Sequence, residues 1–121
     1  MTTIESTAFA DCAELSTVIF AENSQLETIK ERAFMSCHAL EKITIPASVT
    51  HIGDYAFDEC QNLSEVTILA QTPPTLGRSV FPEIAEDLSI FVPKNSLDAY
   101  KAAYPDLADR ILPIMGDDVT D

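Results

Sequence analysis

Three cysteines and two histidines are the side chains of this chain best suited to metal binding or redox chemistry. Cys12, Cys37 and Cys60 form no CxxC pair, the spacing that zinc sites and redox motifs commonly use. Each follows a phenylalanine by three residues, and side chains stacked in parallel lack the converging Cβ vectors of a disulfide. We therefore expect a row of small buried hydrophobic residues. His38 and His51 lack a closed set of partner ligands, so we expect exposed loop histidines and predict no metal site.

Acidic side chains outnumber basic ones by 20 to 7, but their spacing matches no catalytic motif. The sequence contains neither GxSxG nor HExxH, and its three glycines are too few for a phosphate-binding loop. Asp54, Asp58 and Glu59 could bind calcium weakly, yet they lack the regular aspartate spacing of a calcium loop. We prefer to interpret them as a solvated face. We predict no catalytic residues, no cofactor and no enzymatic activity.

The net charge of −13 excludes some classes of partner. A surface of this sign repels the phosphates of nucleic acids and the headgroups of anionic lipids. No stretch approaches the roughly 20 apolar residues of a membrane span, and the first twelve residues lack the basic and apolar regions of a secretory signal. With 121 residues and 46% hydrophobic content, the chain is expected to form one domain with a buried core and no membrane insertion.

The elements that position these side chains follow from a repeat, best seen between Val49 and Leu69. The order AF-x-x-C-x-x-L-x-x-[VI]-x-[FI] occurs three times without a gap, and its phenylalanine moves in steps of 25 and 23 residues, through Phe9, Phe34 and Phe57. Recurrence at a fixed long period is the signature of a repeat architecture. One copy cannot bury its own apolar side, so the copies are expected to stack as coils of a solenoid.

Alternation of apolar and polar residues predicts a short half-buried strand in KITI (42–45), in EVTI (65–68) and in LSIFVP (88–93). The outward positions of four strands align in steps of 25, 23 and 24 residues, through Ile19, Thr44, Thr67 and Phe91. Strands of successive coils should pair about 4.8 Å apart in a parallel sheet. The AFxxC segment has apolar residues at i and i+3, which predicts one turn of α- or 3₁₀-helix. Gly53 precedes this segment, where we expect a sharp turn of the chain.

The end of the chain departs from the repeat and is predicted to cap the stack. Phe81 takes the place of the repeat phenylalanine, and KNSLDAYKAAYPD reads as a helix with Ser96 as N-cap and Asp98 in its first turn. Pro105 should end this helix, Asp106 could cap a further short turn, and ILPI (111–114) is expected to be extended. The residues predicted to cover the open end of the stack are Leu97, Tyr100, Tyr104, Leu107, Ile111 and Ile114.

These patterns divide a single domain, residues 1–121, into successive parts. The repeats run from about 4–24, 25–47 and 48–70, followed by an irregular last coil at 71–94, a C-terminal cap at 95–115 and an acidic tail at 116–121.

The repeat IGDYAFDECQNLSEVTI resembles that of BspA-like, treponemal-type leucine-rich repeat proteins. The ending, AQTPPTLG and then IFVPKNSLDAYKAAYPDLADRILPI, is similar to a terminus common among such proteins from gut and oral bacteria. The resemblance covers Ile4 to Ile114. It implies an α/β fold, a right-handed leucine-rich repeat superhelix with short parallel strands on its concave face, short helical turns and a C-terminal capping helix. Two departures are the small number of repeats and a first copy that begins almost at Met1.

The resemblance also implies a protein-interaction role, because the better-known members are bacterial surface adhesins that bind host matrix proteins or other cells. It therefore implies a secreted or cell-surface location, although the absence of a signal leaves the cytoplasm open. The expected partner-binding residues on the concave face are Thr17, Ile19, Lys42, Thr44, Glu65, Thr67, Ser89 and Phe91. Ile19 and Phe91 are apolar where polar residues are expected, which favours contact with a partner, although isolated exposed apolar residues are common.

A second hypothesis is a structural or self-associating protein. A first coil without a cap would expose apolar side chains, so it would need a longer solenoid or a homodimer to cover it. The residues expected to form this surface are Ile4, Phe9, Leu15, Val18 and Phe20. The sequence does not identify a protein partner under either hypothesis.

Overall fold

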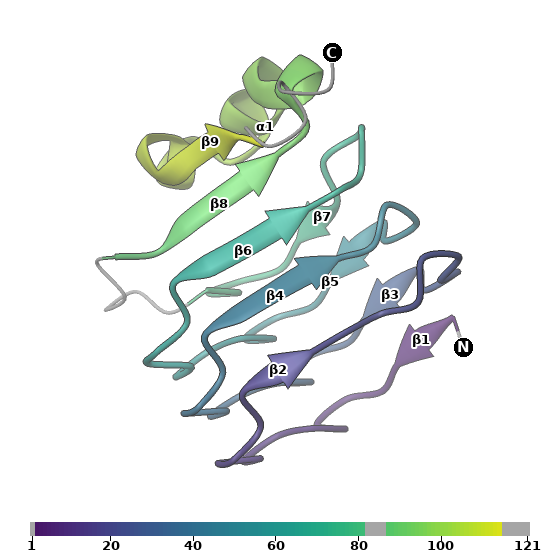
Figure 1. The fold of residues 1–121 in the computed structure, drawn as a ribbon, viewed down its shortest axis with the longest axis vertical. Coiled ribbons are helices and arrows are strands. Elements are labelled where there is room, and N and C mark those ends of the chain that lie inside the picture. Colours follow the sequence, from purple (N-terminus) through teal and green to yellow (C-terminus); the bar gives the residue numbers. More distant parts are fainter. Residues whose placement is uncertain (1, 82–86, 115–121) are drawn as a thin grey trace.

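The computed structural model describes residues 2–81 and 87–114, which form a stack of coils that each cross two sheets (Figure 1). The four-stranded sheet consists, in spatial order, of β1 (Thr3–Ile4), β3 (Thr28–Ile29), β5 (His51–Ile52) and β7 (Thr75–Leu76). The five-stranded sheet consists of β2 (Thr17–Val18), β4 (Lys42–Ile45), β6 (Glu65–Ile68), β8 (Ser89–Val92) and β9 (Ile111–Pro113). All strand pairs in both sheets are parallel, so each coil adds one strand to each sheet.

The five-stranded sheet confirms the strands predicted from alternation. The inward residues of β4, β6 and β8 are buried, whereas their outward neighbours are exposed or half-buried. Thr44 pairs with Thr67 and Thr67 with Phe91, as the aligned period predicted. Side chains of equivalent positions therefore form continuous rows along the stack.

The four-stranded sheet was not predicted. Each of its strands has only two residues, too few to show alternation, and one of these is buried in β1, β3 and β5. His51 is exposed as expected, but it lies in strand β5 and not in a loop, and it pairs with Thr28 and Thr75.

The AFxxC segments are chains of consecutive turns, so the prediction of a helical turn was wrong. In the first coil the N–H groups of Ala8, Ala10 and Cys12 donate to carbonyls three residues back, at 3.1–3.3 Å. The alternate N–H groups donate instead to the next coil, as Phe9 does to Ala33 O at 2.8 Å. A helix would use every N–H internally, whereas stacking requires half of them to point along the stack.

Left-handed backbone conformations interrupt each turn segment and explain why it does not become helical. The residues with positive φ are not glycines and recur at equivalent positions: Thr7, Asp11, Arg32, Ser36, Tyr55, Glu59 and Ser79. Such conformations are unfavourable for residues with a Cβ atom. Hydrogen bonds between coils accompany them, since the N–H of Thr7, Arg32 and Tyr55 each donates to a carbonyl of the next coil.

The chain turns at Gly53 as expected, since Gly53 O accepts a hydrogen bond from Ala56 N at 3.3 Å, but the φ of Gly53 is not positive, so the turn itself does not require a glycine. A Cβ atom at this position would lie 2.6 Å from the backbone nitrogen of Glu31 and 2.9 Å from the carbonyl carbon of Lys30. Gly53 therefore allows the backbones of two coils to approach closely.

A column of stacked phenylalanine rings runs through the coils. The ring centroids of Phe9 and Phe34 are 5.2 Å apart, as are those of Phe34 and Phe57, and the rings are nearly parallel. Phe81 extends the column at 5.8 Å from Phe57, as predicted for the fourth coil. Phe34 and Phe57 are fully buried, so the column lies in the core between the two sheets.

The C-terminal cap consists of two 3₁₀ helices (Lys94–Ser96 and Pro105–Arg110), helix α1 (Leu97–Ala103) and strand β9. Tyr100, Tyr104 and Ile111 are buried, while Leu97, Leu107 and Ile114 are half-buried, as expected of a lid. Asp98 lies in the first turn, and the α-helix ends before Pro105 as predicted. The predicted tail (116–121) lies outside the described residues.

Ser96 occupies the predicted N-cap position of α1 but its side chain does not cap the helix, and the predicted cap at Asp106 was wrong. The hydroxyl of Ser96 donates to Gln71 O at 2.7 Å and makes no capping bond, and Asp106 lies inside the second 3₁₀ helix without capping it. Tyr100 Oη donates to Ala70 O at 2.6 Å, and Tyr104 Oη to Pro74 O at 2.5 Å. Hydroxyl groups of the cap thus satisfy carbonyls of the loop that ends the third coil.

The ring column makes a testable prediction about stability. Phe34→Ala should lower the free energy of unfolding by about 3–5 kcal/mol, because it removes a fully buried ring between two others. Phe9→Ala should cost clearly less, because Phe9 is 39% exposed and stacks on one side only among the described residues. Urea unfolding of dilute protein measures both losses, and equal losses would contradict a stack whose first coil is open.

Candidate interaction surface

The residues predicted to bind a partner lie in two parallel rows on the outward face of the five-stranded sheet. One row contains Thr17, Lys42, Glu65 and Ser89, and the other contains Ile19, Thr44, Thr67 and Phe91. We call these eight residues the outer ladder. The inward side chains between them are held by the core, so the positions of the outward ones follow from strand register.

Exposure of the outer ladder decreases toward the C-terminal end of the sheet. Ile19 lies directly after β2 and is 86% exposed, and Thr17, Lys42 and Thr44 are also exposed. From Glu65 to Phe91 the outward side chains are half-buried. Lys42 Nζ lies 3.4 Å from Glu65 Oε2, with both side chains largely in solvent, so this ion pair contributes little to stability.

Sequence reasoning missed two apolar residues on the same face. Leu112 in β9 is 42% exposed and pairs in register with Phe91, which extends the second row by one strand. Leu69 is 40% exposed and follows Ile68 at the end of β6. The extended segment ILPI was recognised, but nothing in the sequence showed that it pairs with β8. The outward face therefore has apolar side chains at both ends and hydroxyl groups between them.

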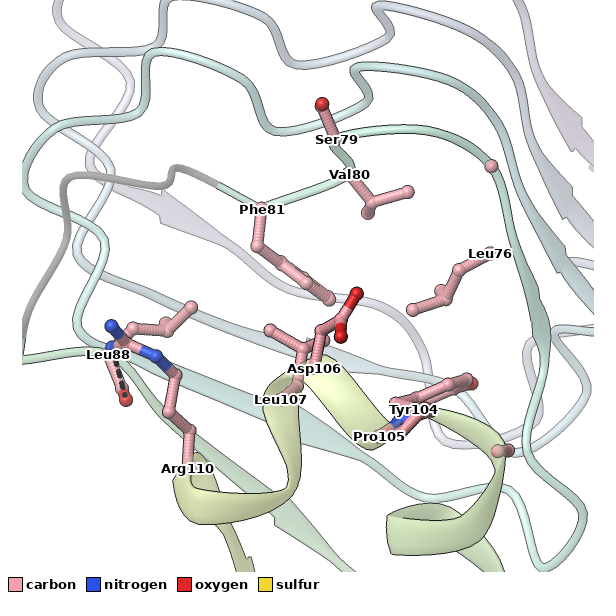
Figure 2. Close-up of a pocket in the computed structure, with 12 residues that line it drawn as sticks. Leu76, Ser79, Val80, Phe81, Leu88, Tyr104, Pro105, Asp106, Leu107 and Arg110 are labelled. Atoms are coloured by element: carbon pink, nitrogen blue, oxygen red, sulfur yellow. Dashed lines mark hydrogen bonds between the residues drawn. The ribbon is translucent and has the colours of Figure 1, made fainter.

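A cavity of about 510 Å³ lies between the last coil and the cap (Figure 2). Leu76 and Phe81 line it from the last coil, and Tyr104 and Leu107 line it from the cap. Its polar residues include Asp106 and Arg110, and a guanidinium nitrogen of Arg110 donates to Leu88 O at 3.4 Å. Walls of this composition could hold a small apolar group, but the described residues show no nucleophile paired with a base there.

Cys37 and Cys60 are buried as expected and their thiols donate hydrogen bonds, whereas Cys12 is only half-buried, so the expected buried row was wrong at that position. Cys37 Sγ lies 3.1 Å from Phe9 O, and Cys60 Sγ lies 3.1 Å from Phe34 O. All three cysteines are free thiols. Burial raises the pKa of Cys37 and raises the pKa of Cys60 to about 12, so both remain protonated donors at neutral pH. Each of these two thiols thus links its coil to the phenylalanine carbonyl of the preceding coil.

Residues 2–81 and 87–114 contain no group of three His, Cys, Asp or Glu side chains that could hold a metal ion. Asp54 has a structural contact, because its Oδ1 accepts a hydrogen bond from the N–H of Arg78 at 2.8 Å. No helix in these residues is long and apolar enough to cross a bilayer.

The first coil presents an apolar surface on the side away from the second coil. Phe9, Cys12, Leu15, Val18 and Phe20 are all more exposed than their equivalents in the second and third coils, which are buried. We call these five residues the N-terminal face. Ile4 was expected to belong to this surface but is only 3% exposed, so that expectation was wrong.

Comparison with protein families gives one match. A family model described as BspA type leucine-rich repeat region, with six copies, covers residues 1–105. No curated protein matches the sequence.

The raised pKa of Cys60 predicts how stability depends on pH. An exposed thiol has a pKa of about 8.5, so between that pH and about 12 the unfolded chain loses a proton that folded Cys60 retains. This group should therefore stabilise the fold fully below pH 8.5 and lower its stability by up to about 1.4 kcal/mol per pH unit above it. Cys60→Ser keeps a hydroxyl donor but does not titrate, so it should flatten the fall between pH 8.5 and 9.5.

Urea midpoints across this pH range measure the effect. Between pH 6 and 7.5 the Cys60 thiol is protonated in both the folded and the unfolded chain. In this range the urea midpoints of Cys60→Ser and of the unchanged protein should vary with pH in parallel, which serves as the control. If the stability of Cys60→Ser fell with pH above 8.5 as steeply as that of the unchanged protein, Cys60 would not be the group responsible for the loss.

Proposed function

Because this chain belongs to the BspA-type leucine-rich repeat family, we propose that it is a non-enzymatic, adhesin-like interaction protein that binds matrix or other cell-surface proteins through its outer ladder. The observation that carries this proposal is the outer ladder itself. Its side chains project from paired strands with buried inward neighbours, so it offers a pre-organised surface. Pre-organisation reduces the entropy lost on binding.

The chemistry of the outer ladder favours a protein ligand. Hydroxyl groups of Thr44 and Thr67 can donate and accept hydrogen bonds, while Ile19 and Phe91 offer apolar contacts at the two ends. Leu112 enlarges the apolar end beside Phe91. This combination of an apolar anchor and adaptable polar groups is typical of protein interfaces.

Proteins of this repeat type are often surface-associated, and on that basis we propose that this protein acts at the cell surface or outside the cell. A net charge of −13 would keep it soluble and would favour ligands with basic patches.

A specific observation favours a second candidate function, in which the first coil is an association surface that dimerises or continues a longer stack. The N-terminal face is apolar, and Phe9 is 39% exposed although the two phenylalanines behind it are fully buried. Four of the five residues expected for this role belong to that face, the exception being Ile4.

The first proposal predicts that Thr44→Arg combined with Thr67→Arg abolishes binding to immobilised extracellular-matrix proteins. Two long charged side chains would obstruct the middle of the outer ladder. Thr44 is exposed and Thr67 is half-buried on the outward face, outside the core, so the urea midpoint should stay nearly unchanged. His51→Arg on the opposite sheet is the matched control and should bind normally. No binding by the unchanged protein would refute the proposal.

The second candidate predicts a mass above that of the monomer. Static light scattering at tens of micromolar, about the range of weak dimers, should give a mass that rises with concentration. A constant monomer mass would exclude self-association and leave the first proposal untouched.

A further inference from the structure

Among the described residues the first coil has a neighbouring coil on one side only, and this, not a different sequence, leaves its surface exposed. Phe9 occupies the same repeat position as Phe34, yet the exposed fraction of its side chain is 39% and that of Phe34 is 0%. Cys12 is half-exposed, whereas Cys37 and Cys60 are fully buried. The first coil therefore keeps the repeat chemistry that buries a coil on both sides.

Both sheets end in an open edge at this side of the stack. Among the described residues β1 pairs only with β3, and β2 only with β4. Glu65 N donates to Glu41 O in the preceding coil, and Thr17 occupies the equivalent register position in β2. The N–H of Thr17 therefore points to the open side, where a further strand could accept its hydrogen bond.

At the opposite end of the stack, the edge of the five-stranded sheet is protected against the same kind of contact. Strand β9 forms the edge of the five-stranded sheet and contains Pro113, which has no N–H to donate. Helix α1 and the second 3₁₀ helix lie at the same end, next to β9 (Figure 1). Among the described residues, both sheets can therefore pair end-on at one end of the stack only.

We propose that a second copy of this chain docks on the N-terminal face through a twofold axis, so that both open sheet edges pair across the dimer. This proposal rests on the second candidate function and specifies which molecule covers the N-terminal face. The axis lies in the face, perpendicular to the strands, and runs from one sheet to the other. It places β2 antiparallel to the β2 strand of the second copy, and β1 likewise, so both edges gain a partner.

Geometry selects a second copy over an unrelated protein. The face carries two strand edges at opposite sides of an apolar core that includes Phe9 and Val18. A partner covers both edges only if its own edges are equally far apart, and a twofold copy meets this condition by symmetry. Because a twofold contact uses the same face on both copies, the association closes at two copies and forms no filament.

Charge gives the proposed dimer a distinctive salt dependence. Residues 4–24 contain no lysine or arginine, and their acidic residues are Glu5, Asp11, Glu14 and Glu22. Two copies therefore repel each other across the face, and added salt should screen this repulsion and tighten the dimer. A basic partner would show the opposite trend.

Sedimentation equilibrium of the full chain tests the proposal. From about 1 to 100 µM, the mass should rise from monomer toward dimer and no further, and about 0.5 M NaCl should increase the dimer fraction. Phe9→Glu places a charge in the apolar core, and Thr17→Pro removes an open edge N–H, so each should reduce association at least tenfold. Leu69→Glu is the matched control, because Leu69 is 40% exposed but lies away from the face, and its dimer should equal that of the unchanged protein.

Thiol alkylation gives a second readout that needs no variant. Iodoacetamide should modify Cys12 in dilute protein and modify it several-fold more slowly at concentrations where the dimer forms. Cys37 and Cys60 are buried and serve as internal controls that should resist modification at all concentrations.

The outcomes separate the two levels of the proposal. A monomer at every concentration, with Cys12 equally reactive throughout, overturns both the dimer and the self-association that the second candidate function includes. Masses beyond dimer, or association that survives Thr17→Pro and Phe9→Glu, overturn the twofold docking but retain self-association. Association that tightens at low salt and requires a basic protein also overturns the second-copy assignment.

Discussion

Each coil of this protein can bury its apolar residues only against another coil, and most features of the structure follow from this constraint. Phe34 is fully buried because a ring lies on either side of it, whereas Phe9 has the same chemistry but one such neighbour. The backbone obeys the same constraint, because half of the turn N–H groups donate between coils. The stability of such a stack comes largely from the interfaces between coils, so the apolar sides of the first and the last coil must be covered in another way.

The features that repeat from coil to coil could be predicted from the sequence. Equal spacing of Phe9, Phe34 and Phe57 indicated the stack, and alternation in KITI and EVTI indicated which side chains face outward. Features shorter than a period were missed, since a two-residue strand such as β5 shows no alternation. The turn segments were misread because apolar spacing at i and i+3 fits a helix and a stacked turn equally well. Only hydrogen bonds between coils distinguish the two.

The cap shows a different limit of sequence reasoning. Ser96 has the residue type of a helix N-cap, and local propensity alone predicts that its hydroxyl binds the helix. In the fold its hydroxyl donates to Gln71 O, and Tyr100 and Tyr104 donate to carbonyls of the same loop. These carbonyls belong to a loop about 25–30 residues earlier, so the sequence around the helix contains no sign of them. Hydrogen bonds to this distant loop therefore override the preference of Ser96 for capping its own helix. The apolar side chains that cover the end of the stack were nevertheless predicted correctly.

The proposed ligand surface and the proposed dimer surface are physically compatible, because they use different parts of the five-stranded sheet. The outer ladder uses side chains that project from its face, while the dimer would use the backbone edge of β2. Antiparallel pairing of the two β2 strands would join two outer ladders into one continuous surface. A ligand with repeated epitopes could then engage both copies, and the second contact would form at a high effective concentration.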